Sequence, residues 1–294
     1  MNACAVAQEP GWWPDWQLFG DALLGGLLLA SVLPLLGIVL VLRQQMFVAA
    51  AIGQAANFGI ATTMVGVAMV TGGHAHEVGA AAFGGLLAAV LASIAALRAM
   101  SARASTLEAR SAWVFLVGGS ASLLLLADAP HGAQALQRLF LSSLLAIEPR
   151  DLAALCVAAA VVIALALRFG HAVLAWAIDP RTAAAHGCRL LRMDLLVGSV
   201  LGSVLGLAMH TTGLVFTFGL TVLPVLAVRE LAPSLRAVLF GAPLLGLAGQ
   251  ALAFGVAHRF DLPPGQVAVV VFGGIAALAR AIAVLSRSSL VRAP

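Results

Sequence analysis

Possible metal ligands gather in one short polar segment of this sequence. The segment TGGHAHEVG places His74, His76 and Glu77 within four consecutive positions. Imidazole nitrogen and carboxylate oxygen are ligands that Zn²⁺ accepts in proteins. The segment is therefore a candidate for capturing a metal ion, although a short polar loop with two histidines is more often only a loop.

A second group of polar side chains falls within or beside apolar sequence. Gln54 and Asn57 lie inside the apolar run 46–70, and His210 comes at the end of another run. Polar side chains at membrane depth usually face a helix bundle or a wet path. Gln54 and Asn57 are thus expected to line a pathway or to form interhelical hydrogen bonds, and His210 to receive an ion or to lie at the membrane interface.

The segment AIDPRTAAAHG carries the signals of a short, capped helix. Asp179 can cap free backbone amides, Pro180 suits the first helical position, and Gly187 can stop the helix. A capped helix of this size is a shape suited to docking a partner, and a plain connector is an equally simple interpretation.

The elements that position these residues are predicted to be membrane-spanning helices. Of the 294 residues, 62% are hydrophobic and 10% charged, with a mean hydropathy of +1.06, which excludes an ordinary water-soluble enzyme. Since a span needs about 20 residues, the sequence predicts an all-α, polytopic bundle of about nine spans, with eight to ten possible. The segment 135–147 is too short to cross and is expected to be re-entrant or interfacial. The predicted spans are 17–42, 46–70, 79–100, 111–127, 151–168, 193–210, 213–228, 233–257 and 264–285.

The arginines predict how this bundle is oriented. With the N-terminus outside, thirteen of the sixteen basic residues fall in inner loops, as the positive-inside rule requires. We therefore expect residues 1–16 to be extracytoplasmic, residues 17–287 to form the transmembrane domain with a cytoplasmic loop at 169–192, and residues 288–294 to be a cytoplasmic tail. Arginines at helix ends give no sign of nucleic-acid binding.

Several other classes of membrane protein are disfavoured. An ion-driven secondary carrier, the main alternative, often places acidic residues at mid-membrane, yet no Asp or Glu falls near the centre of a predicted span. Asp194, beside Arg192, is interpreted as a helix-start charge at the membrane surface. An intramembrane hydrolase would need a motif such as HExxH, which is absent, and Cys4, Cys156 and Cys188 are too scattered for a disulfide framework.

Five segments, in order along the chain, resemble the permease subunits of metal-ion ABC importers, the zinc, manganese and iron group typified by the bacterial high-affinity zinc permease. The segments, which cover nearly the whole chain, are ALLGGLLLASVLPLLGIVLVLRQQMFVAAAIGQAANFGIA from Ala22, LFLSSLLAIEPRDL from Leu139, AIDPRTAAAHG from Ala177, GLVFTFGLTVLPVLAV from Gly213 and DLPPGQVAVVV from Asp261.

The resemblance implies a permease of the bacterial inner membrane that pairs with a second copy of itself. It would bind a cytosolic ABC ATPase and receive metal from an extracytoplasmic binding protein. Zn²⁺, or Mn²⁺ or Fe²⁺, would be the transported cargo, no cofactor would be bound permanently, and the permease itself would not be an enzyme; no GxxxxGK[ST] loop is present. The residues that would couple it to the ATPase are Asp179, Pro180, Arg181, Ala184 and Gly187.

The second predicted span departs from the family pattern. That span commonly carries an aspartate and, four residues later, a histidine, which face one side of the helix and can ligate a divalent ion. The corresponding residues here are Ala50 and Gln54. Alanine cannot ligate and a neutral amide is a poor zinc ligand. Either other groups form the pathway, or the ion passes without firm coordination, or the cargo differs.

Overall fold

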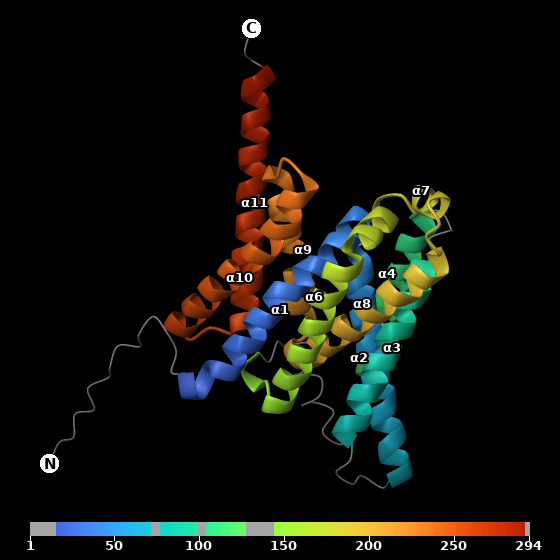
Figure 1. The fold of residues 1–294 in the computed structure, drawn as a ribbon. Coiled ribbons are helices and arrows are strands. Elements are labelled where there is room, and N and C mark those ends of the chain that lie inside the picture. The colour runs from blue at the N-terminus through green and yellow to red at the C-terminus, as the bar shows by residue number, and fades with distance from the viewer. Residues whose placement is uncertain (1–15, 72–76, 99–103, 128–143, 292–294) are drawn as a thin grey trace, which may run out of the picture.

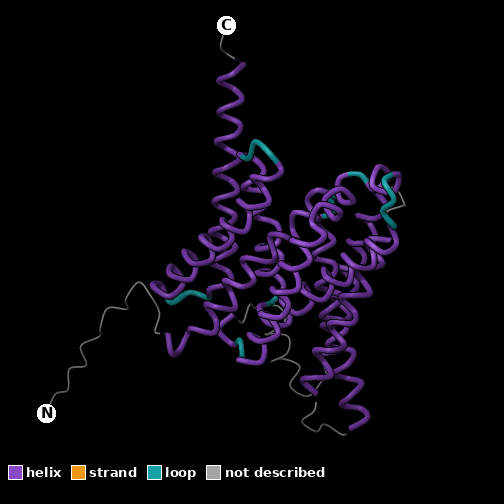
Figure 2. Tube along the Cα trace, viewed as in Figure 1, coloured by secondary structure: helices purple, strands orange, loops and turns teal. Residues whose placement is uncertain are grey.

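The computed structural model describes residues 16–71, 77–98, 104–127 and 144–291 and contains only helical elements in those ranges. Figure 2 shows that helices account for nearly all of the described trace. The prediction of an all-α bundle is therefore confirmed. The elements are α1 Trp16–Leu42, α2 Met46–Thr71, α3 Glu77–Arg98, α4 Ala104–Ala127, the short 3₁₀ helix η2 Leu144–Ala146, α6 Pro149–Ile178, α7 Pro180–Ala185, α8 Leu190–Thr212, α9 Leu214–Leu231, α10 Leu235–Phe260 and α11 Pro264–Val291.

Eight of the described helices are long and apolar enough to cross a membrane. The remaining predicted span, 79–100, corresponds to α3, whose apolar part, Ala82–Arg98, is shorter but packs along α2 and α8. Helix α1 begins at one end of the bundle and α11 finishes at the other (Figure 1). Most of the predicted segment 135–147 lies outside the described residues.

Helix α6 is longer than the apolar run that predicted it. The sequence expectation ended this helix at 168, but the helix continues to Ile178. Arg168 does not end it because a charged side chain at a membrane surface can project from a continuing helix. The helix starts at Pro149, where a capping box joins the backbone amide of Glu148 to the Asp151 carboxylate at 3.3 Å.

Glycines let the helices of the bundle approach closely. Three glycines four residues apart on α8, Gly198, Gly202 and Gly206, lie against α3, and Gly202 meets the backbone of Ala89 and Val90 with no room for a Cβ. Such contacts are how membrane helices pack without a hydrophobic driving force between them. The three glycines therefore form a packing surface between α8 and α3.

Candidate translocation and coupling sites

Helix α7 begins with the cap that the sequence predicts. The Asp179 carboxylate accepts hydrogen bonds from the Arg181 backbone amide at 2.9 Å and from the Thr182 hydroxyl at 2.5 Å, and Pro180 occupies the first helical turn. The Thr182 hydroxyl, followed by the backbone amides, holds the pKa of Asp179 below its usual value. These bonds satisfy groups that would otherwise be left open at the helix start.

A left-handed glycine ends α7. Gly187 has φ +84°, and the adjacent Cys188 amide reaches back to the Ala183 carbonyl at 3.0 Å. A residue with a Cβ rarely adopts such a φ, so glycine is suited to this position. The predicted cap and stop of this helix are thus both confirmed.

Most of the surface of α7 is exposed. Ala183 is its one buried residue, whereas Arg181, Thr182 and Ala184 are exposed. Figure 1 places α7 at one end of the bundle, between α6 and α8. The five residues expected to couple to an ATPase therefore lie together on one small projecting element.

A cluster that the sequence did not single out lies beside α7. The Trp176 indole donates a hydrogen bond to Asp194 Oδ1 at 3.2 Å, and the Arg43 guanidinium carbon lies 3.6 Å from the centre of the Trp176 ring. Asp194 is half-buried and lies beyond the first turn of α8, so it does not act as the helix-start charge that was expected but is joined to the interior of the fold. The available signal was a tryptophan and a lone acid flanking the same arginine-rich loop.

Gln54 is buried against α4. Its side chain is 3% exposed and its Oε1 accepts a hydrogen bond from Asn57 Nδ2 at 3.4 Å. Gly118 and Gly119 of α4 lie directly opposite, close enough that a Cβ on Gly119 would stand 3.1 Å from Gln54 Oε1. Asn57 Oδ1 is buried without a hydrogen-bond partner among the described residues. An amide pair therefore lies between α2 and α4.

His210 lies in the last turn of α8 and is half-buried. The residue before it, Met209, packs onto Gly53 of α2, which leaves no room there for a Cβ. Gly53 is in turn the neighbour of Gln54. The candidate pathway residues Gln54 and His210 are therefore each the sequence neighbour of a residue in the same contact between α2 and α8.

The buried polar side chains of the described spans are all uncharged. They are glutamine, asparagine, serine and threonine residues, and most of the hydroxyls bond to carbonyls of their own helix. Thr212 and Thr217 join α8 to α9 through a hydroxyl contact of 3.1 Å. The described residues contain no group of three His, Cys, Asp or Glu side chains that could hold a metal ion.

The predicted capture segment falls largely outside the described residues. His74 and His76 are not described, and Glu77 is described only as the first residue of α3. Their role in metal capture stays a prediction.

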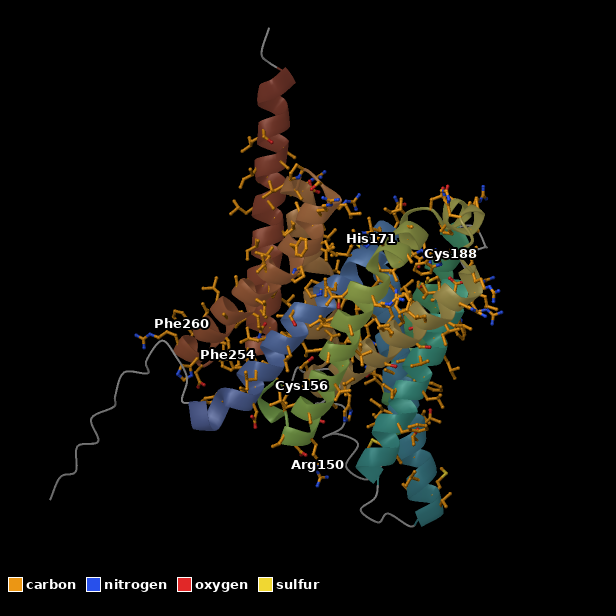
Figure 3. The ribbon with its side chains drawn as sticks, in the orientation of Figure 1. Arg150, Cys156, His171, Cys188, Phe254 and Phe260 are labelled. Carbon is orange, nitrogen blue, oxygen red and sulfur yellow. The ribbon has the colours of Figure 1, made fainter. Side chains whose placement is uncertain are left out.

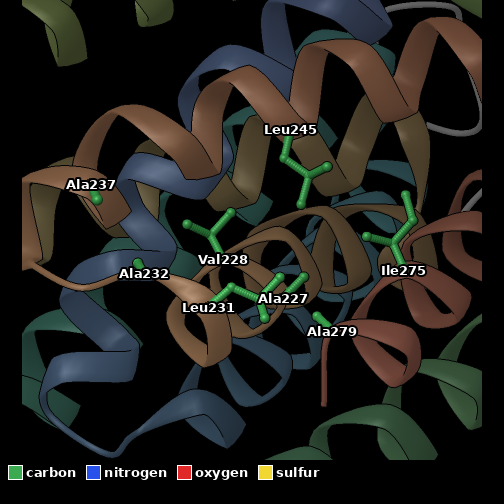
Figure 4. A pocket seen from close by; sticks show the side chains of 8 residues that line it. All are labelled: Ala227, Val228, Leu231, Ala232, Ala237, Leu245, Ile275 and Ala279. Atoms are coloured by element: carbon green, nitrogen blue, oxygen red, sulfur yellow. The ribbon is translucent and has the colours of Figure 1, made fainter. Parts of the chain in front are cut away.

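Two other features carry no ligand chemistry. A cavity of about 330 Å³ between α9, α10 and α11 is lined by eight alanine, valine, leucine and isoleucine residues, which offer no metal ligand (Figure 4). Cys156 and Cys188 lie far apart, with Cys156 near the beginning of α6 and Cys188 just after α7 (Figure 3). They cannot form a disulfide with each other in this arrangement.

The model of a family described as the ABC 3 transport family matches residues 15–283. The fold is similar to that of PsaBC from Streptococcus pneumoniae, solved in complex with a Fab, with a TM-score of 0.72 and 17% identity over 89% of this chain and 90% of that chain. It is also similar to an inward-facing structure described as a metal-chelate type ABC transporter, with a TM-score of 0.68 and 14% identity over 90% of this chain and 87% of that one. No curated protein sequence matches the chain at a significant level.

Proposed function

Because the chain belongs to the ABC 3 transport family, the permeases of metal-ion ABC transporters, we propose that it is the membrane subunit of an importer for a divalent transition metal. The eight helices of the described residues that are long and apolar enough to span fit a multi-pass protein of the bacterial inner membrane. Zinc is the first candidate cargo, with manganese and iron next. ATP would be hydrolysed by a separate cytosolic subunit, and the metal would come from an extracytoplasmic binding protein.

The observation that carries this proposal is the form of α7. It is a capped, exposed helix of six residues between two spanning helices, joined to each by a short connection. A loop shaped in this way can seat in a cleft of a partner and carry a rigid-body movement to the helices on both sides. On this proposal a second copy of the chain completes the permease, and ATP-driven closure of two ATPase subunits moves both copies of α7.

The alternative is a secondary carrier driven by an ion gradient. Such carriers place ionisable groups within the membrane to couple the driving ion. The buried polar residues of the described spans are all neutral, which favours the ABC importer.

Co-purification tests the two classes directly. The tagged chain is extracted in mild detergent from its native membrane, the proteins that accompany it are identified, and ATP hydrolysis is measured. A co-purifying ABC ATPase with activity that depends on the permease is expected. A chain that purifies alone from several mild detergents, without ATPase activity, would favour the carrier.

Gln54 offers a test of the pathway. If it lines the route of the metal, Gln54→His should change the relative uptake of zinc, manganese and iron, because imidazole is a far better ligand for transition metals than a neutral amide. The matched control is Gln250→His, which alters another fully buried amide, on α10. Equal uptake ratios in the wild type and in Gln54→His would remove Gln54 from the pathway.

A further inference from the structure

The loop that carries α7 is anchored at both ends by one buried side chain. Trp176 lies three residues before the Asp179 cap, near the end of α6, and Asp194 lies in the first turns of α8. The hydrogen bond from the Trp176 indole to Asp194 joins these two helix ends. Trp176 is 0% exposed, so its ring is enclosed on all sides.

The opposite side of this anchor is the turn between α1 and α2. Arg43 follows α1, and its guanidinium stacks on the Trp176 ring. The turn itself is fixed by its backbone, because Gln44 has a left-handed φ of +56° and the Gln45 amide bonds to the Leu40 carbonyl at 2.8 Å. Arg43 is therefore held by a rigid turn, so its guanidinium moves together with the end of α1 and the start of α2.

The opposite charges of Arg43 and Asp194 favour the observed arrangement, in which both lie beside Trp176. Burial lowers the pKa of Arg43 to about 10, opposed by the negative charge of Asp194, so the guanidinium is charged at neutral pH. Arg98, at the end of α3, also acts electrostatically on Asp194. Arg43 Nη1 is buried without a hydrogen-bond partner among the described residues. The stacking on Trp176 and the attraction of Asp194 are what compensate this half-buried cation.

The remaining contacts of α7 are few. Ala183 is its one buried residue, so α7 is held mainly through its covalent connections to α6 and α8. A force on α7 must then reach the bundle through the ends of those two helices. These are the ends that Trp176 and Asp194 link to each other and, through Arg43, to the start of α2.

We propose that Arg43, Trp176 and Asp194 form a clamp that transmits movement of α7 to the turn between α1 and α2. The three are positioning residues and touch neither ATP nor metal. Breaking the clamp would leave α7 able to move with the ATPase while α2, which carries Gln54, no longer follows. This inference rests on the proposed docking of an ATPase on α7.

The test is the ratio of metal uptake to ATP hydrolysis. The complex of permease and co-purified ATPase is measured for ATP hydrolysis, and the same variants are measured for uptake of radioactive zinc, manganese and iron in cells that lack the chromosomal copy. Arg43→Gln removes the cation, Asp194→Asn removes the charge, and Trp176→Phe keeps a ring but removes the indole N–H. A desolvated cation–π contact is strong enough that we expect uptake per ATP to fall about tenfold in Arg43→Gln, with hydrolysis within about twofold of wild type.

Two further variants separate coupling from folding. Glu230→Gln breaks the ion pair between Glu230, whose side chain is 27% exposed, and Arg280, whose side chain is 62% exposed. This variant should leave the ratio of uptake to ATP hydrolysis unchanged. Arg43→Lys restores a cation over the ring and should recover part of the lost uptake. If Arg43→Gln does not accumulate in the membrane, Asp194→Asn and Trp176→Phe provide the same readout.

The outcomes are distinct. Wild-type ratios in all three clamp variants, or a parallel loss of uptake and hydrolysis in complexes that still assemble, would overturn the clamp. A wild-type chain that brings down no ATPase and supports no metal uptake would refute the proposed function, and the clamp with it.

Discussion

Substitution of Gly187 by alanine isolates the backbone conformation that ends α7. An added Cβ meets nothing within 4 Å, so the change introduces no collision. It does place a side chain on a residue with φ +84°, which costs roughly 1–2 kcal/mol for an L residue in left-handed conformation. That energy corresponds to a shift of about 5–30-fold in a two-state equilibrium. The backbone hydrogen bonds that close the end of α7 should therefore be broken about 5–30-fold more often.

Hydrogen exchange measures this opening directly. The amides of His186 and Cys188 bond back to carbonyls of α7, and their exchange should accelerate by about 5–30-fold in Gly187→Ala if they exchange through local opening. Gly170→Ala is the matched control, because it also adds a methyl group into open space, but within helix α6. Gly187→Asn, which tolerates the left-handed region better, should lie between the two. Equal exchange in Gly187→Ala and Gly170→Ala would refute the reasoning.

Three further expectations concern the Asp179 cap, the contact of Gly202 with α3 and the ion pair of Glu230 with Arg280. Because hydrogen bonds lower the folded pKa of Asp179, its cap is complete above the unfolded carboxyl pKa of about 3.9 and is lost as pH falls through the lower folded value. Protection of the α7 amides, corrected for intrinsic exchange, should thus stay level from about pH 7 to 5 and decline only below about pH 4, and Asp179→Ala should abolish this dependence. Gly202→Leu should destabilise the detergent-solubilised chain by about 1–3 kcal/mol or more, since the side chain meets the backbone of α3, whereas Gly170→Leu should have little effect on the midpoint of thermal unfolding. Glu230→Gln should change stability by less than about 1 kcal/mol, and a larger loss would mean that its exposed pair is more than a surface contact.

The spanning helices and α7 are predictable because their determinants are local. A long apolar run needs an internally bonded backbone in lipid, whatever its neighbours are. Asp179, Pro180 and Gly187 act on the residues next to them, so the bounds of α7 follow from its own sequence. The end of α6 was harder to predict from the sequence. Arg168 resembles a residue at which a span leaves the membrane, but the helix stops only at Ile178, where Asp179 caps the next helix.

The clamp was not predictable from local rules, because its members come from three separate elements. Nothing in the residues around Arg43 indicates that a tryptophan far along the chain lies beneath it. The contact exists because α1 packs against both α6 and α8, which brings the turn after α1 to the place where α6 ends and α8 begins. The positive-inside pattern predicts that these three ends share one side of the membrane, but not that they touch.

Gln54 shows a related limit. The sequence places it at membrane depth, and its alignment with a family ligand suggests a pathway, but neither determines which neighbour its amide faces. That neighbour is decided by α4, where two consecutive glycines leave space for the amide at Gln54. An amide held between α2 and a glycine pair can serve packing as well as transport, because small residues and interhelical hydrogen bonds both stabilise membrane helices. The two roles predict different results. If Gln54 serves packing, its substitution changes the stability of the protein and so changes the uptake of every metal alike. If Gln54 lines the pathway, its substitution changes the ratio of uptake between metals.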